Sequence, residues 1–303
     1  MPDSPDARVV VAGASGLIGR ALVAALRADG VAVTRLVRRP AHGADEVEWD
    51  PGREQLHPDV LAGARAVVGL NGATLGRFPW TKRYQHELVW SRIAPTQALA
   101  AAVRRLGDDA PAFVSASAVG YYPSAPGAEL TEDAPRGESF LADLCGEWEA
   151  AAQRGAGERA RVALLRTAPV VHAEGVLKPL LLLTRLGVSG PIGRGTQVWP
   201  WISLEDEVRA IRHVIDAGLT GPVNLSGPQR ATANDLGFAL ARRMNRPYLL
   251  RVPAWALRAA LGRDAAEGLL LGDLPVVPRA LTASGFVFSH PTVEDAVDAA
   301  VPA

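Results

Sequence analysis

The chain has 303 residues, 48% of them hydrophobic, which is enough to bury a core in one large or two unequal domains. Lysine plus arginine and aspartate plus glutamate each number 32, so no net charge attracts nucleic acid or an acidic membrane surface. One cysteine excludes an internal disulfide, and no apolar run reaches transmembrane length. With residues 1–7 expected as a frayed tail and not a signal peptide, we predict a soluble, cytoplasmic protein without nucleic-acid or membrane partners.

The first unit of the chain is a strand, a glycine-containing turn, a helix and a second strand. Residues 9–13 are β-branched or small, which predicts a strand buried on both faces, and an amphipathic helix follows as far as Ala28. A second apolar strand is expected at 31–37. This βαβ arrangement is the framework that holds a dinucleotide pyrophosphate at a helix N-terminus.

The glycines of the turn have the spacing GxxGxxG, and each has a physical role. Gly13 allows a sharp turn, Gly16 lets backbone N–H groups approach phosphate oxygens, and Gly19 lets the helix pack closely on the sheet. Tight turns also collect glycine, but the position between a strand and a helix favours cofactor binding. The cofactor-binding residues predicted here are Gly13, Ser15, Gly16, Leu17, Ile18 and Gly19.

The end of the second strand distinguishes the two nicotinamide cofactors. An acidic residue there would accept hydrogen bonds from a ribose 2′-OH, but this sequence has Arg38 and Arg39 and no carboxylate in 31–40. Guanidinium groups clamp a 2′-phosphate. We therefore predict NADP(H) over NAD(H), the alternative being that one or both arginines are merely solvated.

Further strands are expected at 46–51, 65–72, 112–117 and 161–166, with helices at 81–106 and 138–152. Pro95 predicts two helices or a kink in the first of these. Asn71, Gly72 and Ser115 are further predicted cofactor-binding residues, since cofactors lie along the carboxyl ends of such strands. Alternation of strands and helices predicts an α/β fold with a Rossmann-type doubly wound parallel sheet.

The sequence pattern becomes less regular beyond residue 168, where glycines interrupt the apolar runs. Ser203–Asp206 and Thr232–Asp235 have the capping-box pattern, a short strand is expected at 223–226, and helices at 253–261, 264–271 and after 291. We predict an NADP-binding Rossmann domain at 8–167 and a smaller C-terminal α+β substrate lobe at 168–303. The lobe includes a small helical domain at about 253–300, and the cleft between the halves is the expected substrate site.

Several motifs resemble the extended short-chain dehydrogenases/reductases of the NAD(P)-dependent epimerase/dehydratase superfamily, and the resemblance covers nearly the whole chain. It is narrower to the atypical branch described as nucleoside-diphosphate-sugar epimerases, which closes with a small domain of unknown function. Besides the glycine turn, the matching stretches are 115–122, Ser91-Arg92 with Thr96, 140–144 with Trp148-Glu149, 199–208 and 278–286.

The resemblance also exposes a departure from the usual catalytic pattern. Extended members carry a Tyr-x-x-x-Lys pair, in which the tyrosine exchanges a proton with the substrate oxygen and the lysine lowers its pKa. Phe140 and Leu144 occupy the corresponding places here, and no such pair occurs elsewhere. The atypical branch generally lacks the pair, so the gap fits the narrower resemblance and removes the usual mechanism.

Ser117 and Tyr121 are the predicted catalytic residues. The resemblance places Ser117 near the superfamily's catalytic Ser/Thr, where its hydroxyl either bonds the substrate oxygen or only caps the strand. Tyr121 or Tyr122 donates a proton only if a cation lies nearby, because a free phenol has a pKa of about 10, and at least one of the two is expected to pack. The cations considered are Lys82, Arg166, Lys178 and Arg194.

Other side chains support weaker interpretations. Glu147 and Glu149 follow an apolar stripe and are interpreted as a solvated face. Trp80, Trp199 and Trp201 either stack on a flat ligand or pack, and packing is favoured for Trp201. The histidines have no metal-ligand spacing and no Gly-x-Ser-x-Gly elbow occurs, so neither a metal site nor a serine hydrolase is predicted.

The leading hypothesis is an NADP(H)-binding oxidoreductase or epimerase that acts on a small hydroxyl- or carbonyl-bearing substrate, with a nucleotide sugar as one candidate. The alternative is an NADP(H)-binding redox sensor or regulator that has lost the chemistry, which explains Phe140 and Leu144 directly. A weaker third reading is a protein-interaction scaffold. Extended members often pair through the helices expected at 81–106 and 138–152, so the resemblance also allows a homodimer.

Overall fold

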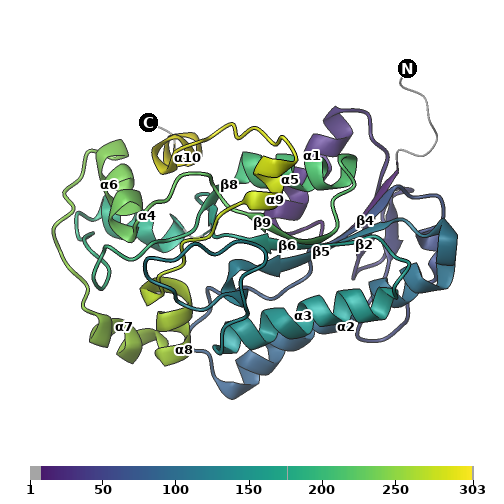
Figure 1. The fold of residues 1–303 in the computed structure, drawn as a ribbon, viewed down its shortest axis with the longest axis horizontal. Helices are drawn as coiled ribbons and strands as arrows, with labels where there is room; N and C mark the ends of the chain where they lie inside the picture. Colours follow the sequence, from purple (N-terminus) through teal and green to yellow (C-terminus); the bar gives the residue numbers. More distant parts are fainter. Residues whose placement is uncertain (1–7, 176, 302–303) are drawn as a thin grey trace.

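A computed structural model describes residues 8–175 and 177–301, so the expected tail at 1–7 lies outside the described residues (Figure 1). At its centre is a seven-stranded sheet with the order β3-β2-β1-β4-β5-β6-β9, in which every neighbouring pair is parallel. The strands predicted at the sequence level are confirmed. Their bounds are β1 (Val9–Ala12), β2 (Val33–Val37), β3 (Glu46–Glu48), β4 (Ala66–Gly69), β5 (Ala112–Ala118), β6 (Val162–Thr167) and β9 (Gly221–Leu225).

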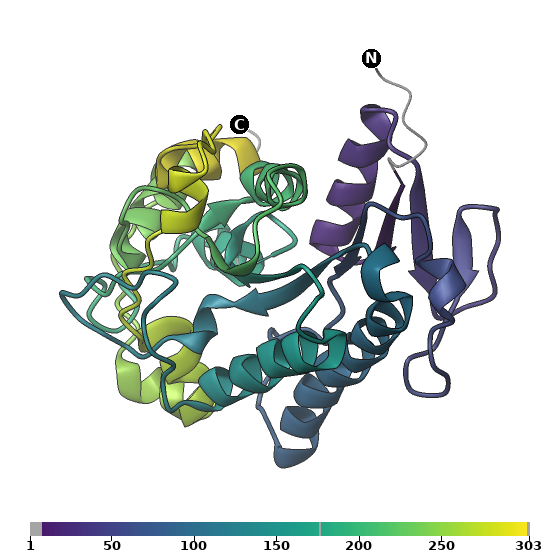
Figure 2. The same cartoon turned by 45° about the vertical axis from the view of Figure 1, so that its right-hand side comes forward.

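Helices cover both faces of this sheet, as the doubly wound prediction requires (Figure 2). One face carries α1 (Leu17–Ala28) and α5 (Leu204–Asp216), and the other carries α2 (Lys82–Leu106) and α3 (Phe140–Ala156). Alternate residues of β1 pack into the two layers, which is why its sequence is apolar without a polar face. The two buried layers together fix the carboxyl edge of the sheet.

The boundaries of α2 and α3 follow from their caps. The Thr81 side chain accepts the N–H of Tyr84, and α2 then continues through Pro95 as one helix, so of the two alternatives at Pro95 the division into two helices is wrong. The Ser139 hydroxyl accepts the N–H of Ala142, so α3 begins two residues after the predicted start. It ends at Ala156, four residues past the predicted end.

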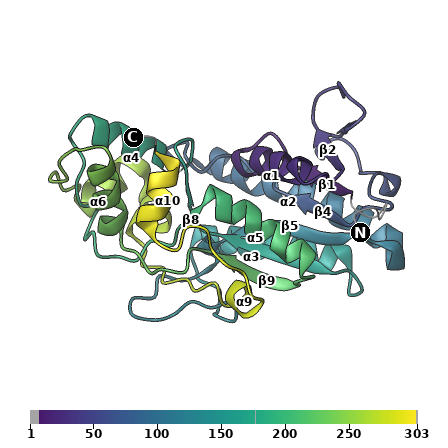
Figure 3. The ribbon, with the colours of Figure 1, turned by 90° about the horizontal axis from the view of Figure 1, so that it is seen from above.

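The smaller lobe contains a two-stranded parallel sheet and a group of helices (Figure 3). Its elements are β7 (Val170–Val171), β8 (Ile202–Ser203), α4 (Leu177–Arg185), α6 (Ala233–Arg243), α7 (Ala254–Leu261), α8 (Arg263–Ala266), α9 (Arg279–Ala283) and α10 (Val293–Ala300). A π-helical turn, Glu267–Leu271, follows α8. The capping box predicted at Thr232 is complete, whereas Ser203 caps α5 without the reciprocal bond.

The chain passes between the two halves more than once. After β7, α4 and β8 it returns to the sheet as α5 and β9, and then leaves again for α6. Helix α9 packs back against β9. Because the connection is shared among several segments, no single linker is visible in the sequence.

Candidate functional site

The glycine turn lies between β1 and α1, and two of its positions have no room for a side chain. Gly13 has a φ of +81°, and a Cβ there would lie 2.7 Å from the carbonyl carbon and oxygen of Leu70. A Cβ at Gly19 would collide with the carbonyl oxygen of Gly13. The turn therefore holds the start of α1 against the ends of β1 and β4, as the sequence predicts.

The N-terminus of α1 is open toward the solvent at this turn. Gly16 is the N-cap residue, no side chain caps the helix, and its first turn has no acidic residue. Ser15 and Gly16 are exposed, while Leu17 and Ile18 are half-buried. The first N–H groups of a helix lack partners within it, so this end of α1 fits an anion such as a pyrophosphate.

The two arginines after β2 have different surroundings. Arg39 donates two hydrogen bonds to the carboxylate of Glu46, at 2.8 and 2.7 Å, and lowers the pKa of that carboxyl to about 2. Arg38 is exposed, and no ion pair or side-chain hydrogen bond of its guanidinium is found within the described residues. Arg38 is thus free to meet a ligand, and Arg39 is held on β3. Glu46 was missed at the sequence level because carboxylates were sought only in residues 31–40.

Asn71 and Gly72 follow β4 at the same edge of the sheet. The side-chain oxygen of Asn71 is buried and has no hydrogen-bond partner among the described residues, so a ligand donor would satisfy it. Buried Arg92 donates to the carbonyl of Ala73, and the Ser91 hydroxyl accepts the N–H of the same residue, at 2.9 Å. The Ser91-Arg92 motif therefore holds the segment after β4 in place.

Ser117 belongs to a buried ionic network on the face of the sheet covered by α3. Its hydroxyl donates to Glu149 at 2.7 Å, and Arg166 donates to both oxygens of that carboxylate at 2.8 and 2.9 Å. The interpretation of Glu149 as a solvated residue is wrong, because it is only 6% exposed and is paired with Arg166. The sequence signal was Arg166 itself, since a charge in an apolar strand needs a buried partner. Ser115, two residues earlier on β5, is fully buried.

Two adjacent tyrosines lie against this network in different ways. The Tyr122 hydroxyl accepts from Arg166 at 2.9 Å and donates to Asn224 at 2.7 Å, and burial raises the pKa of Tyr122 to about 12. The Arg166 guanidinium lies 3.6 Å from the centroid of the Tyr121 ring, which is half-buried. Within the described residues no hydrogen bond involves the Tyr121 hydroxyl. The Tyr122 hydroxyl therefore uses its hydrogen bonds within the fold. The Tyr121 hydroxyl has no partner among the described residues, and its ring lies beside a cation.

The two positions that the usual tyrosine and lysine would occupy hold apolar residues here, and both residues pack among other apolar side chains. Phe140 lies 5.9 Å from the ring of Trp80, centroid to centroid, and Leu144 is 3% exposed within the same cluster. Burial also raises the pKa of Cys145 to about 12, so this thiol stays protonated. Phe140 and Leu144 themselves therefore offer neither a proton nor a positive charge.

The remaining candidates do not gather at the two tyrosines. Arg194 pairs with Asp273 at 3.1 Å. Trp80, Trp199 and Trp201 are all buried and each indole N–H donates to a backbone carbonyl, so the packing interpretation of Trp201 is confirmed. Among the four cations considered, Arg166 is the one that contacts either tyrosine.

A second buried acid lies on the opposite face of the sheet. Glu207 on α5 has no exposed surface, and one of its oxygens accepts from the Thr167 hydroxyl at 2.9 Å. The other oxygen has no partner among the described residues, and burial raises the pKa of Glu207 to about 8. Arg166 and Thr167 are consecutive on β6 and point to opposite faces, so one buried carboxyl is paired with a guanidinium and the other accepts from a hydroxyl.

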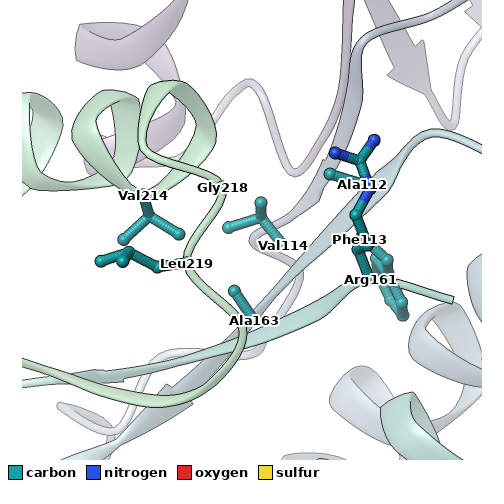
Figure 4. Close-up of a pocket in the computed structure, with 8 residues that line it drawn as sticks. All are labelled: Ala112, Phe113, Val114, Arg161, Ala163, Val214, Gly218 and Leu219. Atoms are coloured by element: carbon teal, nitrogen blue, oxygen red, sulfur yellow. The ribbon is translucent and has the colours of Figure 1, made fainter. Parts of the chain in front are cut away.

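Two cavities of the described part of the chain are lined by residues other than those of this edge of the sheet. Figure 4 shows a cavity of about 10 Å³ where β5 and β6 begin and α5 ends, which has room for no more than about one water molecule. A groove of about 510 Å³ runs between α1, α5 and α10. Ser203 lines this groove, but it is 3% exposed and its hydroxyl caps α5, so its proximity to His290 makes no hydrolase site.

Comparison with known proteins assigns the chain to a family. The family model of the NAD dependent epimerase/dehydratase family matches residues 9–225, and that of a domain of unknown function (DUF1731) matches residues 252–300. The chain belongs to the NAD-dependent epimerase/dehydratase family, with this additional C-terminal domain, as the sequence motifs indicated.

Three relatives make the assignment narrower. The epimerase family protein ML0860 of Mycobacterium leprae is 42% identical over 296 residues, covering 97% of this chain and 95% of that protein. The crystal structure of human epimerase family protein SDR39U1 with NADPH superposes with a TM-score of 0.88 at 31% identity, covering 97% and 98% of the two chains. The nucleoside-diphosphate sugar epimerase of Corynebacterium glutamicum gives 0.77 at 29% identity, covering 97% of this chain and 57% of that one.

Proposed function

We propose that this protein is a cytoplasmic NADP(H)-dependent oxidoreductase or epimerase that acts on a small substrate with a hydroxyl or carbonyl group. Three features of the binding edge fit the cofactor: the open start of α1, the unsatisfied oxygen of Asn71 and the free guanidinium of Arg38. The human relative whose structure contains NADPH aligns over this whole region. The nicotinamide, when bound, donates or accepts the hydride.

The observation that carries the chemistry is the pairing of Tyr121 with Arg166 at the carboxyl ends of β5 and β6. The Arg166 guanidinium lies 3.6 Å from the centroid of the Tyr121 ring, so the cation beside this phenol comes from β6, where the usual pair has a lysine on a helix. Tyr121 donates the proton to the substrate oxygen in reduction and accepts it in oxidation. Ser117 acts behind it as a positioning residue, because its hydroxyl donates to the carboxylate that holds Arg166.

Transfer of deuterium from (4-²H)NADPH tests this function on a panel of small carbonyl compounds and nucleotide sugars. We expect label in the product with the native protein and its loss with Tyr121→Phe, which keeps the ring against Arg166 and removes only the hydroxyl. The affinity for NADPH is the control, and it should be unchanged in this variant. Full transfer by Tyr121→Phe would exclude Tyr121 as the proton donor.

A second function is favoured by a separate observation. Phe140 and Leu144 stand where the usual proton donor and cation would be, and the Ser117 hydroxyl donates to Glu149. A redox sensor that only binds NADP(H) needs none of these groups for proton transfer. Tight NADPH binding with no label transfer over a broad panel would support this regulator. The scaffold hypothesis requires in addition that the protein bind neither cofactor.

A further inference from the structure

The zero net charge of the chain conceals two segments without any acidic residue. Residues 175–204 contain three cations, and residues 236–263 contain six, with no aspartate or glutamate in either. The rest of the chain therefore carries an excess of acid that balances them. An expectation based on total charge alone says nothing about such a local field.

The fold brings these two segments together at one end of the molecule. The N–H groups of Leu249 and Leu250 both donate to the carbonyl of Ser189, at 2.9 and 3.1 Å, and that of Val252 donates to Pro191 at 2.9 Å. In Figure 1 the elements concerned, α4, α6 and α7, lie at the left end of the long axis, away from β2 and β4 at the right. The two acid-free segments are thus neighbours at this end of the molecule.

These two segments also expose large apolar side chains. Of the eleven large hydrophobic residues that are exposed in the described part of the chain, eight lie in these two segments. Leu249 is 78% exposed, Trp255 71% and Leu186 66%. We call the set of Leu186, Val188, Phe238, Leu249, Leu250 and Trp255 the apolar tip.

Unpaired cations accompany the apolar tip. Arg185 precedes Leu186, Arg246 and Arg251 flank the two leucines at 249–250, and Arg242 lies one helical turn after Phe238 on α6. All four are exposed, and none forms an ion pair with another described residue. The cations of these segments that do form pairs are Arg194, Arg243 and Arg258.

We propose that the apolar tip is a docking surface for an anionic phospholipid membrane. A second copy of the chain would bring two sets of like-charged arginines into one interface, and a nucleic acid would leave the leucines without an apolar partner. The interface of an anionic bilayer accepts both groups at once, because arginines meet the headgroups while leucine and tryptophan enter the acyl boundary. Charge complementarity together with exposed apolar area therefore favours the lipid surface.

Co-sedimentation of the full-length protein with vesicles tests the proposal. We expect binding to vesicles of phosphatidylcholine with about a third phosphatidylglycerol, little binding to pure phosphatidylcholine, and release by salt. L249E/L250E should abolish binding, and Arg246→Gln and Arg251→Gln should each weaken it about fivefold. Trp90→Glu is the matched control, since Trp90 is 52% exposed on α2, outside the tip, and should bind like the native protein.

Several results would overturn the proposal. They are an absence of vesicle binding at low salt, equal binding by the tip variants, or loss of binding in Trp90→Glu as large as in L249E/L250E. A dimer of the native protein that L249E/L250E converts to a monomer would assign the tip to self-association. Preference for single-stranded RNA over vesicles would assign it to nucleic acid. Thermal melting shows that each variant is folded, and the arginine variants test the surface if the double substitution is not.

Discussion

The two halves of the sheet's carboxyl edge preserve the family pattern to different degrees. Around β1 and β4 the chain keeps glycine where no side chain fits, at Gly13 and Gly19, and Arg38 has no ion-pair partner among the residues that the structure describes. Around β5 and β6 the usual tyrosine and lysine positions hold Phe140 and Leu144. Binding of a dinucleotide uses backbone groups and the space that glycines leave, whereas proton transfer uses particular side chains. The glycines of the binding half are therefore kept in a chain whose usual proton-transfer residues are replaced.

The replaced half is nevertheless not empty of chemistry. Arg166 joins Glu149, Tyr121 and Tyr122 in one buried cluster, and Ser117 donates to the same carboxylate. The cation of the site thus comes from a strand instead of a helix. If the cluster carries function, variants in this half should affect turnover without affecting cofactor affinity, and variants in the other half should do the reverse.

The largest effect is expected from Arg166→Met. It leaves the buried Glu149 without its partner, which should lower the free energy of unfolding by about 3–5 kcal/mol, measured by urea denaturation. Arg159→Met is the control, because Arg159 and Asp108 form an exposed pair that contributes less than about 1 kcal/mol. Similar small losses in both variants would show that the buried pair does not hold this half together.

Glu207→Gln tests the neutral carboxyl on the other face. Because the pKa of Glu207 is raised to about 8 in the folded state, above its usual value near 4.5, the folded protein binds the extra proton between these values. Stability should therefore fall as pH rises from about 4.5 to 8, by at most about 1.4 kcal/mol per unit from this group. The glutamine variant should lose that part of the slope in denaturation series. An unchanged slope would mean that Glu207 is ionised in the fold.

Gly13→Ala tests the binding half by geometry alone. A positive φ costs an alanine about 1–3 kcal/mol, and the Cβ would also press on the carbonyl of Leu70, so both stability and NADPH affinity should fall. Gly30→Ala is the matched control, since Gly30 has a φ of +75° with nothing within 4 Å of the added carbon. Calorimetric NADPH binding should separate the two, with Gly30→Ala losing stability only.

Arg38→Ala and Arg39→Ala sharpen the comparison within the binding half. Loss of a charge-assisted bond to the 2′-phosphate should weaken NADPH binding about tenfold or more in Arg38→Ala and leave NADH binding unchanged. Arg39→Ala should have a smaller effect on NADPH, because this guanidinium is held by Glu46. The reverse order of effects in titration calorimetry would show that the ion pair opens for the cofactor.

Sequence reasoning reached the fold and the glycine turn because local pattern determines both. A short stretch of sequence is enough to show the alternation of apolar strands and amphipathic helices. It is also enough to show the glycines that sterics require, at Gly13 and Gly19. The seventh strand, β9, arrives from beyond the expected domain boundary, and its place beside β6 depends on pairing that no local pattern specifies.

The ionic clusters were harder to predict from the sequence, because no local pattern specifies which distant residues pair. Glu46 pairs with Arg39 across adjacent strands, and Glu149 pairs with Arg166 from helix to strand. Each acid looked like an ordinary surface residue in its own segment. The basic partner gave the clue in the sequence. Arg166 lies in an otherwise apolar strand, so its charge needs a buried acid beside it.

The smallest effect is expected from Phe140→Tyr, which restores the phenol of the usual pair but not its cation. The side chain is half-buried beside Trp80, so an added hydroxyl should change the free energy of unfolding by less than about 1 kcal/mol. Deuterium transfer should stay at the native rate, because Leu144 offers no charge to lower the pKa of the new phenol. A clear gain in transfer would place the reacting oxygen near α3 instead of near Tyr121, and would return the proton step to the family's usual position.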